Sequence, residues 1–188
     1  MCRVRACLCP CPIYVPIILA SIVISLMLST PPVLANFDII TFCANHETSD
    51  LLLLGDDELL DIISKKAFDY FWHEANPYNG LIPFSGAKGS PCSIKVVGLG
   101  LSAIPVGIER GWISREEGYE RAFTTLSTFS SDRIQRENGF FYQLLDMDEG
   151  TRFEMSRVSS MDTCILVAGA LFIGEFFSET VVQDLAYD

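Results

Sequence analysis

The sequence contains only two histidines, His46 and His73, among 188 residues. It also lacks the G-x-S-x-G motif, whose sharp turn presents the nucleophilic serine of many hydrolases. A Ser-His-Asp triad needs a histidine as its base. Because His73 falls within a predicted helix and His46 lies near the start of the expected mature chain, the sequence gives little support to this chemistry. We expect His73 to be structural.

Basic residues are also scarce. The chain has 13 Lys and Arg against 24 Asp and Glu, and its formal net charge is −11. Proteins that bind nucleic acid neutralise phosphate groups with lysine and arginine. A surface this acidic repels phosphates, so the composition argues against a nucleic-acid partner. It is typical of a well-solvated exported protein.

The cysteines form no regular framework. Three of the seven, Cys43, Cys92 and Cys164, lie outside a short N-terminal cluster, and their wide spacing predicts neither a disulfide scaffold nor a metal site. A Cys43–Cys92 bridge stays possible after export. Cys164 falls in an apolar helix, where we expect a small buried hydrophobe. No cofactor is indicated. The N-terminal cluster is Cys2, Cys7, Cys9 and Cys11.

Residues 1–35 have the composition of a signal peptide. Two arginines precede an apolar stretch, Ile13–Leu28, and small or neutral residues stand before a cut predicted after Ala35. The mature protein would then be periplasmic or secreted, and removing two positive charges from −11 leaves −13. The alternative is a membrane anchor through residues 13–28, although Pro16 interrupts that stretch. Residues 36–55 form a lead-in segment of mixed character.

Four helices of two alternating kinds are predicted in residues 56–188. Two are apolar on one side only, and each is followed by a helix that is apolar on nearly every side. One-sided helices have a wet face, whereas a helix that is apolar all round is covered on both sides. This order predicts an all-α fold of helical hairpins with outer and inner layers. The expected helices are 56–75, 94–111, 114–129 and 160–177.

The two longest loops, 76–93 and 130–159, each run from an outer to an inner helix. They should therefore lie on one rim of the molecule, where function usually concentrates. The segment 139–155 predicts a short β-hairpin around the turn 148–150. We expect this hairpin to lie at the rim.

Two helix starts carry the spacing of a capping box. Ser114 and Glu117 stand at the start of one predicted helix, and Ser159 and Asp162 stand at the start of another. In a capping box each side chain accepts a hydrogen bond from the other residue's backbone amide. Asp162 could close such a box, or it could be a fixed functional carboxylate at the rim. The sequence leaves both roles open.

The segment 98–103 has the form G-x-G-x-x-A, which also occurs in dinucleotide-binding proteins. That fold needs a strand before the glycines and an acid at the end of a second strand about 20 residues later. The corresponding place here is the polar helix start near Glu117, and Pro105 would break or kink the first helix. We therefore regard a nucleotide site as a minor alternative and expect Gly98 and Gly100 to allow close helix packing.

Carboxylates remain as the catalytic possibility. Asp162 is the strongest candidate, because it stands at the N-terminal end of a predicted inner helix. The other acids near the second loop should be solvated turn residues. Aromatic side chains before this helix, Phe141 and Tyr142, could hold a sugar ring. Those other acids are Asp146, Asp148, Glu149 and Glu154.

Several segments resemble the glycoamylase-like proteins of bacteria, which include endo-β-1,2-glucanases. The resemblance covers roughly residues 56–178, and its most specific part combines V-G-I-E-R-G-W-I-S with G-F-F-Y and S-S-x-D-T. It implies an (α/α)6 toroid whose cleft lies near the N-termini of the inner helices. It also implies hydrolysis of a β-linked glucan by two carboxylates. The matching segments are FDYFWHEANPYNGL, GLGLSAIPVGIERGWISREEGYERA, GFFYQLLDMDEGTRFEMSRVSSMDTCILVAGALF and GEFF.

The resemblance assigns roles to individual residues. Asp162 occupies the acid position of S-S-x-D-T, and Ser160 is the second serine of that motif. Arg157 stands where the family often has an acid; it cannot be a base, but it can bind a sugar hydroxyl. We therefore predict Asp162 as catalytic, and Phe141, Tyr142, Arg157 and Ser160 as substrate-binding.

The resemblance also sets an expectation for completeness. Four helices make up a third of a toroid of six hairpins, so we expect a truncated fragment, with another essential acid beyond its end. Such a partial ring would expose apolar surface of its inner helices, which predicts a protein partner or a missing C-terminal part that covers it. The alternative function is a non-catalytic carbohydrate-binding or assembly module.

Overall fold

The computed structural model describes residues 54–188, and it confirms the predicted all-α class with short β-pairs. The signal peptide, the anchor alternative and Cys43 lie outside these residues. No helix within residues 54–188 is both long and apolar enough to cross a membrane. The helices are α4 (Asp56–His73), α5 (Ile94–Glu109), α6 (Arg115–Ser130), α7 (Ser160–Phe176) and α8 (Val181–Tyr187). The strands are β1 (Cys92–Ser93), β2 (Arg136–Glu137), β3 (Phe140–Phe141) and β4 (Leu144–Leu145).

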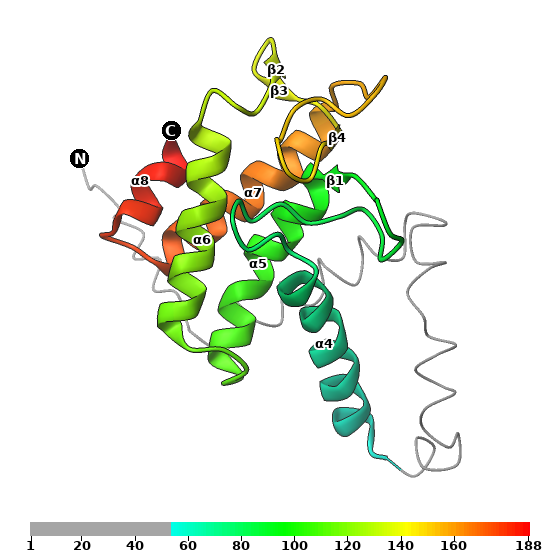
Figure 1. Ribbon diagram of the computed structural model, residues 1–188. Coiled ribbons are helices and arrows are strands. Elements are labelled where there is room, and N and C mark those ends of the chain that lie inside the picture. Colours follow the sequence, from blue (N-terminus) through cyan, green and yellow to red (C-terminus); the bar gives the residue numbers. More distant parts are fainter. Residues whose placement is uncertain (1–53) are drawn as a thin grey trace, which may run out of the picture. The chain divides into compact units, whose positions relative to one another are not determined.

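The two apolar helices, α5 and α7, pack against each other at the centre of this part of the chain (Figure 1). Their backbones approach closely at two glycines. A Cβ atom on Gly98 would lie 2.5 Å from the carbonyl oxygen of Ile165, and one on Gly169 would lie 2.1 Å from the carbonyl oxygen of Gly98. Gly100 similarly leaves room for the Ile82 side chain. The prediction that Gly98 and Gly100 allow close packing is confirmed.

The outer helices α4 and α6 lie against α5, and α8 contacts both α6 and α7. The predicted capping box of α6 is present, because Glu117 N–H donates to Ser114 Oγ at 3.1 Å and Ser114 N–H donates to Glu117 Oε2 at 2.7 Å. Ala122 and Phe129 of α6 are buried as an apolar stripe predicts. Helical spacing places Phe123 on the same stripe and predicts its burial, but this prediction is wrong, since 42% of its surface is exposed.

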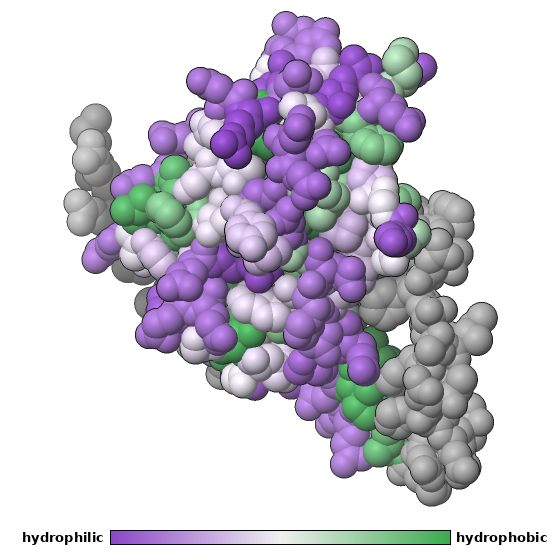
Figure 2. Space-filling model, viewed as in Figure 1, coloured by the Kyte–Doolittle hydropathy of each residue, from purple (hydrophilic) through white to green (hydrophobic). Residues whose placement is uncertain are grey.

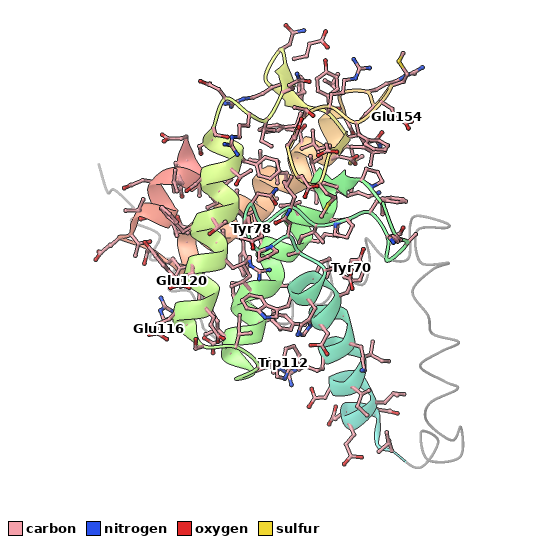
Figure 3. All side chains as sticks on the ribbon, viewed as in Figure 1. Tyr70, Tyr78, Trp112, Glu116, Glu120 and Glu154 are labelled. Carbon is pink, nitrogen blue, oxygen red and sulfur yellow. The ribbon has the colours of Figure 1, made fainter. Side chains whose placement is uncertain are left out.

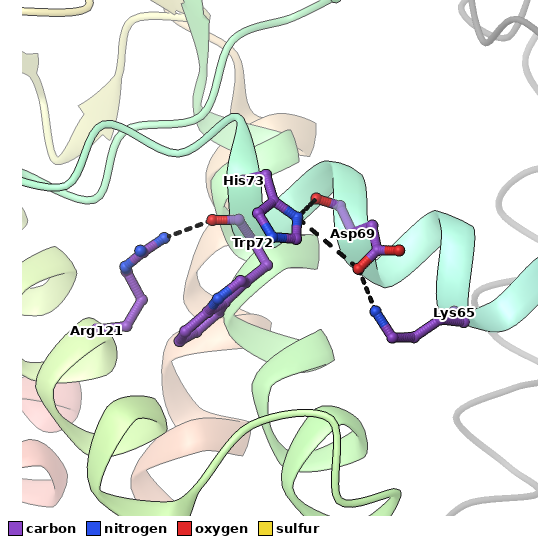
Figure 4. A network of polar contacts seen from close by, with 5 residues as sticks. All are labelled: Lys65, Asp69, Trp72, His73 and Arg121. Carbon is purple, nitrogen blue, oxygen red and sulfur yellow. Dashed lines mark hydrogen bonds and ion pairs between the residues drawn. The ribbon is translucent and has the colours of Figure 1, made fainter.

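A polar network joins the outer helices (Figure 4). Arg121 of α6 lies over the ring of Trp72 of α4 and donates a hydrogen bond to the Trp72 carbonyl oxygen at 3.1 Å. Desolvation lowers the pKa of Arg121. Lys65 pairs with Asp69 on α4, and His73 Nδ1 lies 3.0 Å from the Asp69 carbonyl oxygen. These contacts agree with a structural role for His73.

The inner helix α5 is covered on nearly every side, but α7 is covered on one side only. The buried positions of α7 include Leu166, Gly169 and Ile173. The opposite side carries an apolar stripe at helical spacing, exposed over the described part of the chain. Cys164 belongs to this stripe, so its predicted burial is wrong. We call Met161, Cys164, Val167, Ala168 and Leu171 the open face of α7.

The short strands pair differently from the predicted hairpin. β2 pairs with β3, while β4 pairs antiparallel with the distant β1. The turn 148–150 forms as predicted, but its two sides are connected by isolated bridges, Leu145 to Arg152 and Tyr142 to Val158, and by no paired strands. The Asp146 carboxylate accepts the backbone amides of Asp148 and Glu149, both at 2.9 Å, which makes it the turn residue that we expected. Pairing with β1 fastens the second rim loop to the start of α5.

Candidate functional site

The N-terminus of α7 is held in place by the segment that contains β3. Tyr142 and Val158 form an antiparallel bridge, and Ser159 N–H donates to the Phe141 carbonyl oxygen at 3.2 Å. The Thr163 hydroxyl accepts the Phe141 amide at 3.1 Å and donates to the Ser159 carbonyl oxygen at 2.7 Å. Strand and helix are therefore tied together by both backbone and side-chain bonds. This fixes the first turn of α7.

Asp162 lies in that fixed turn and is buried, with only 6% of its surface exposed. Its backbone N–H donates to Ser159 Oγ at 3.1 Å, so Ser159 caps α7 as predicted. The reciprocal bond is missing, because the Ser159 amide is already bound to Phe141. Asp162 Oδ2 has no hydrogen-bond partner within residues 54–188. The hypothesis that Asp162 closes a capping box is therefore wrong.

An unpartnered buried carboxylate oxygen needs a reason. Leaving a buried polar group without a hydrogen bond costs on the order of 1–3 kcal/mol in proteins. Nearly all buried polar atoms of native proteins have partners, and the exceptions often belong to catalytic or binding sites. Asp162 also stands at the positive end of a helix, which favours a negative charge. The geometry therefore agrees with a carboxylate kept available for a ligand.

Tyr142 lies beside this helix start in a layered cluster. The Arg152 guanidinium lies over its ring, 4.7 Å from the centroid, and the Tyr142 hydroxyl donates to Glu137 Oε2 at 3.1 Å. One face of the ring is therefore covered by Arg152. A sugar ring could stack only on the other face. Arg152 Nε is buried and has no partner within the described residues.

The other predicted substrate-binding residues are placed differently. Phe141 is turned into the core, where it packs edge-on against Phe129. It supports the site from below and offers little surface to a ligand. Arg157 and Ser160 are exposed, and their side chains form no hydrogen bond or ion pair within residues 54–188. Both are free to contact a ligand at the entrance of α7.

Two alternative kinds of site are not supported by the geometry. Gly98 and Gly100 lie inside α5, where no tight turn exists to hold a pyrophosphate, so the nucleotide-site hypothesis is wrong. Residues 54–188 also contain no group of three or more His, Cys, Asp or Glu that could hold a metal ion. Cys92 lies in β1, just before α5, and is fully buried. Burial raises the pKa of its thiol to about 12.

Two contributors to the rim were missed by sequence reasoning. Thr163 joins strand to helix, and Arg152 covers Tyr142. The predicted turn 148–150 brings Arg152 opposite Leu145. The sequence could therefore have indicated that Arg152 lies close to Tyr142. The role of Thr163 depends on β3 docking onto α7, which no local pattern shows. Glu154, in the same loop, projects away from the helices (Figure 3).

Comparison with known proteins gives a consistent group of relatives. The chain is 38% identical over 135 residues to an exo-β-1,2-glucooligosaccharide sophorohydrolase of Parabacteroides distasonis, a match that covers 67% of this chain. A glucoamylase-like protein of Bacteroides uniformis has a TM-score of 0.66 at 27% identity. The endo-β-1,2-glucanase of Chitinophaga pinensis, solved with sophorotriose and glucose, has a TM-score of 0.62 at 26% identity. No family model matches the chain.

The matches are partial on the side of the relatives. The chain spans 18% of the sophorohydrolase, while each of the two solved structures is matched over 35% of its length and 71% of this chain. The resemblance to glycoamylase-like proteins and β-1,2-glucanases is confirmed for this part. The helical hairpins of residues 54–188 thus correspond to an incomplete (α/α)6 toroid, as predicted.

Proposed function

We propose that this chain, which is similar in sequence and fold to β-1,2-glucan hydrolases, contributes the Asp162 rim of a glycoside hydrolase that acts on β-linked gluco-oligosaccharides. The observation that carries the proposal is the buried Asp162 carboxylate, whose Oδ2 lacks a hydrogen-bond partner within the described residues. The relatives that match this part of the chain hydrolyse or bind β-1,2-linked glucose, by their names.

The proposed chemistry assigns one role to each group. A glycosidase flanks the scissile bond with two carboxyl groups, one as general acid and the other as base or nucleophile. Asp162 is one of this pair in our proposal. The sugar is positioned by Arg157, by Ser160 and by the side of the Tyr142 ring that Arg152 does not cover. The second carboxylate is not assigned to any residue. A single carboxylate can bind substrate, but it cannot complete the reaction by this mechanism.

Substitution of Asp162 tests the proposal. In the hydrolase to which this chain contributes, Asp162→Asn should reduce the release of reducing sugar from β-1,2-linked gluco-oligosaccharides at least about a hundredfold, the lower range for a general acid or base. Its free energy of unfolding should stay equal or rise, because the oxygen that it changes makes no bond. Ser156→Ala, which removes a hydroxyl bond to the Leu144 amide, is a control for loop damage. Full hydrolysis by Asp162→Asn would contradict the proposal.

The alternative is a non-catalytic carbohydrate-binding or assembly module. It is favoured by the open face of α7, whose apolar residues are exposed over the described part of the chain. We propose that this face is covered by a protein partner or by further helices. Cys164 reports on this, because its thiol should react with a soluble disulfide reagent in the isolated chain and be protected in the assembly. Binding of oligosaccharide without any turnover would favour the module.

Export is part of the same proposal. A cut after Ala35 would deliver the protein to the periplasm or the medium, where extended glucans are met. Mass spectrometry of the N-terminus, after expression in a bacterium with a secretion pathway, tests it. A mature chain that retains residues 13–28 would support the membrane-anchor alternative.

A further inference from the structure

A second feature lies on the solvent-facing side of α6, separate from the α7 start. It is a groove of about 350 Å³, with the 78–79 loop on one side, the 148–150 turn on another and α6 as its floor. This volume is within the range of small-molecule sites, roughly 300–1,000 Å³. We call it the α6 groove. The proposed function uses none of its residues.

Tyr78 is the most unusual residue of the α6 groove. Its surface is 90% exposed, and it lies on the face of the molecule shown in Figure 3. Phe123, 42% exposed, lines the same groove. Two exposed aromatic rings at one groove offer apolar surface that a ligand can cover. Apart from them the surrounding surface is mainly hydrophilic (Figure 2).

The loops that form the walls are fixed to each other before any ligand arrives. Asn76 Nδ2 and Asn79 Nδ2 donate to the Met147 carbonyl oxygen at 3.0 and 2.9 Å. The Asn76 side chain also accepts the Tyr78 amide at 2.9 Å, which fixes the backbone that carries the ring. A preformed site loses less entropy on binding. The exposed Tyr78 is therefore displayed by a braced loop.

The polar groups of the α6 groove define the class of ligand. Ser127 and Thr124 contribute hydroxyl groups, while Arg133, Asp148 and Glu149 form no ion pair within residues 54–188. One positive and two negative charges disfavour an anionic ligand, and two carboxylates alone make a poor metal site. Asp148 Oδ1 accepts a hydrogen bond from Asn76 Nδ2 at 3.4 Å. Carboxylates and a guanidinium can each bind two neighbouring hydroxyl groups. Aromatic rings suit the C–H face of a sugar.

We propose that the α6 groove is a second, non-catalytic binding site for a neutral oligosaccharide. Tyr78 and Phe123 provide the apolar contact, and Arg133 and Asp148 bind hydroxyl groups. The inference goes beyond the proposed function, since binding here needs neither Asp162 nor turnover. This site would hold one part of a glucan on the outer surface of α6 while another part of the same glucan occupies the rim near Asp162.

Backbone NMR of the full chain, titrated with β-1,2-linked glucotetraose, separates the two sites. The amides of residues 78, 79, 127 and 149 report on the α6 groove, and those of 160–163 report on the rim. We expect the groove amides to shift, with affinity reduced at least about tenfold in Tyr78→Ala. Ser127→Trp, which fills the groove, should have the same effect. Tyr187→Ala removes an exposed tyrosine on α8 and should leave the groove shifts unchanged.

The outcomes decide the two proposals separately. Groove shifts that survive both Tyr78→Ala and Ser127→Trp would overturn the second site, as would their absence in the parent chain. Shifts confined to 160–163, together with loss of hydrolysis in Asp162→Asn, would keep the proposed function and remove the groove. Groove shifts that persist in an Asp162→Asn variant whose hydrolysis is unchanged would keep the second site and overturn the proposed function. A parallel titration with maltotetraose reports whether the groove distinguishes the linkage.

Discussion

The starts of α6 and α7 share one sequence pattern and use it differently. At α6, Ser114 and Glu117 bond to each other in both directions on an exposed surface. At α7, Ser159 accepts the Asp162 amide, but its own amide is bound to Phe141 and the carboxylate stays buried without a partner at Oδ2. The difference comes from a strand: β3 docks at α7, whereas no strand within residues 54–188 pairs beside the start of α6.

This comparison shows how a structural motif can carry a functional group. A capping box needs the amide of the first residue to be free. Once a neighbouring strand takes that amide, the acid three residues later no longer has a local bond. At an exposed position the acid would simply turn to water. At a buried position it stays fixed and available, which makes Asp162 the better candidate for chemistry and Glu117 the better one for stability.

The largest expected difference concerns the bodies of the two helices. A Cβ on Gly169 of α7 would meet the Gly98 backbone oxygen at 2.1 Å, whereas one on Gly118 of α6 would meet side-chain atoms, Ile108 Cδ1 at 2.6 Å and Ile104 Cγ2 at 2.9 Å. Backbone cannot move aside as easily as a side chain. We expect Gly169→Ala to lower the free energy of unfolding by about 3 kcal/mol or more. Gly118→Ala should cost about 1 kcal/mol or less, because alanine favours the helix.

Urea denaturation of both variants measures this difference. In the absence of urea, each variant should keep the helical circular dichroism of the parent if α7 can move enough to accommodate the added methyl group. Equal losses of stability at Gly169 and Gly118 would contradict the close backbone contact between α5 and α7.

An intermediate difference is expected at the two capping serines. Ser159→Ala leaves the amide of the buried Asp162 without an acceptor, which should cost about 2 kcal/mol. Ser114→Ala removes the acceptor of the Glu117 amide, which water can replace at this exposed position, and should cost about 1 kcal/mol. Thermal or urea unfolding measures both, and Ser→Thr at each site is a matched control that keeps an acceptor oxygen. A larger loss at Ser114 would show that β3, and not Ser159, holds the start of α7.

Much of the fold was readable from the sequence because it depends on local patterns. The α6 capping box and the close packing at Gly98 follow from residue type and spacing. The turn at 148–150 follows in the same way. Helical spacing places Phe123 on the apolar stripe of α6, but spacing alone does not fix where such a stripe ends. Spacing shows which residues share a face, and neighbouring helices decide how much of that face is covered.

The candidate site was less readable because it depends on contacts between distant segments. Asp162 was identified by its position before an apolar helix, but its missing bond results from β3. Phe141 and Tyr142 are adjacent in the sequence, yet strand geometry sends one ring into the core and leaves the other half-exposed. The pairing of β4 with β1 joins residues about fifty positions apart. No local pattern specifies that partner.

The smallest expected effect is the pH dependence of the α6 capping box. Hydrogen bonds from the Ser114 backbone and hydroxyl lower the pKa of Glu117. A carboxyl group whose pKa is lower in the folded state stabilises the fold above its unfolded pKa, near 4.3, and loses this contribution as the pH falls through the folded value. Glu117→Gln should therefore be slightly less stable than the parent at neutral pH, and the gap should close in acid. Unfolding curves of both proteins between neutral pH and pH 3 measure the gap, with the exposed Glu120→Gln as control. A gap that stays constant with pH would mean that the Glu117 charge plays no part in the cap, and that the two helix starts differ only in what β3 does at α7.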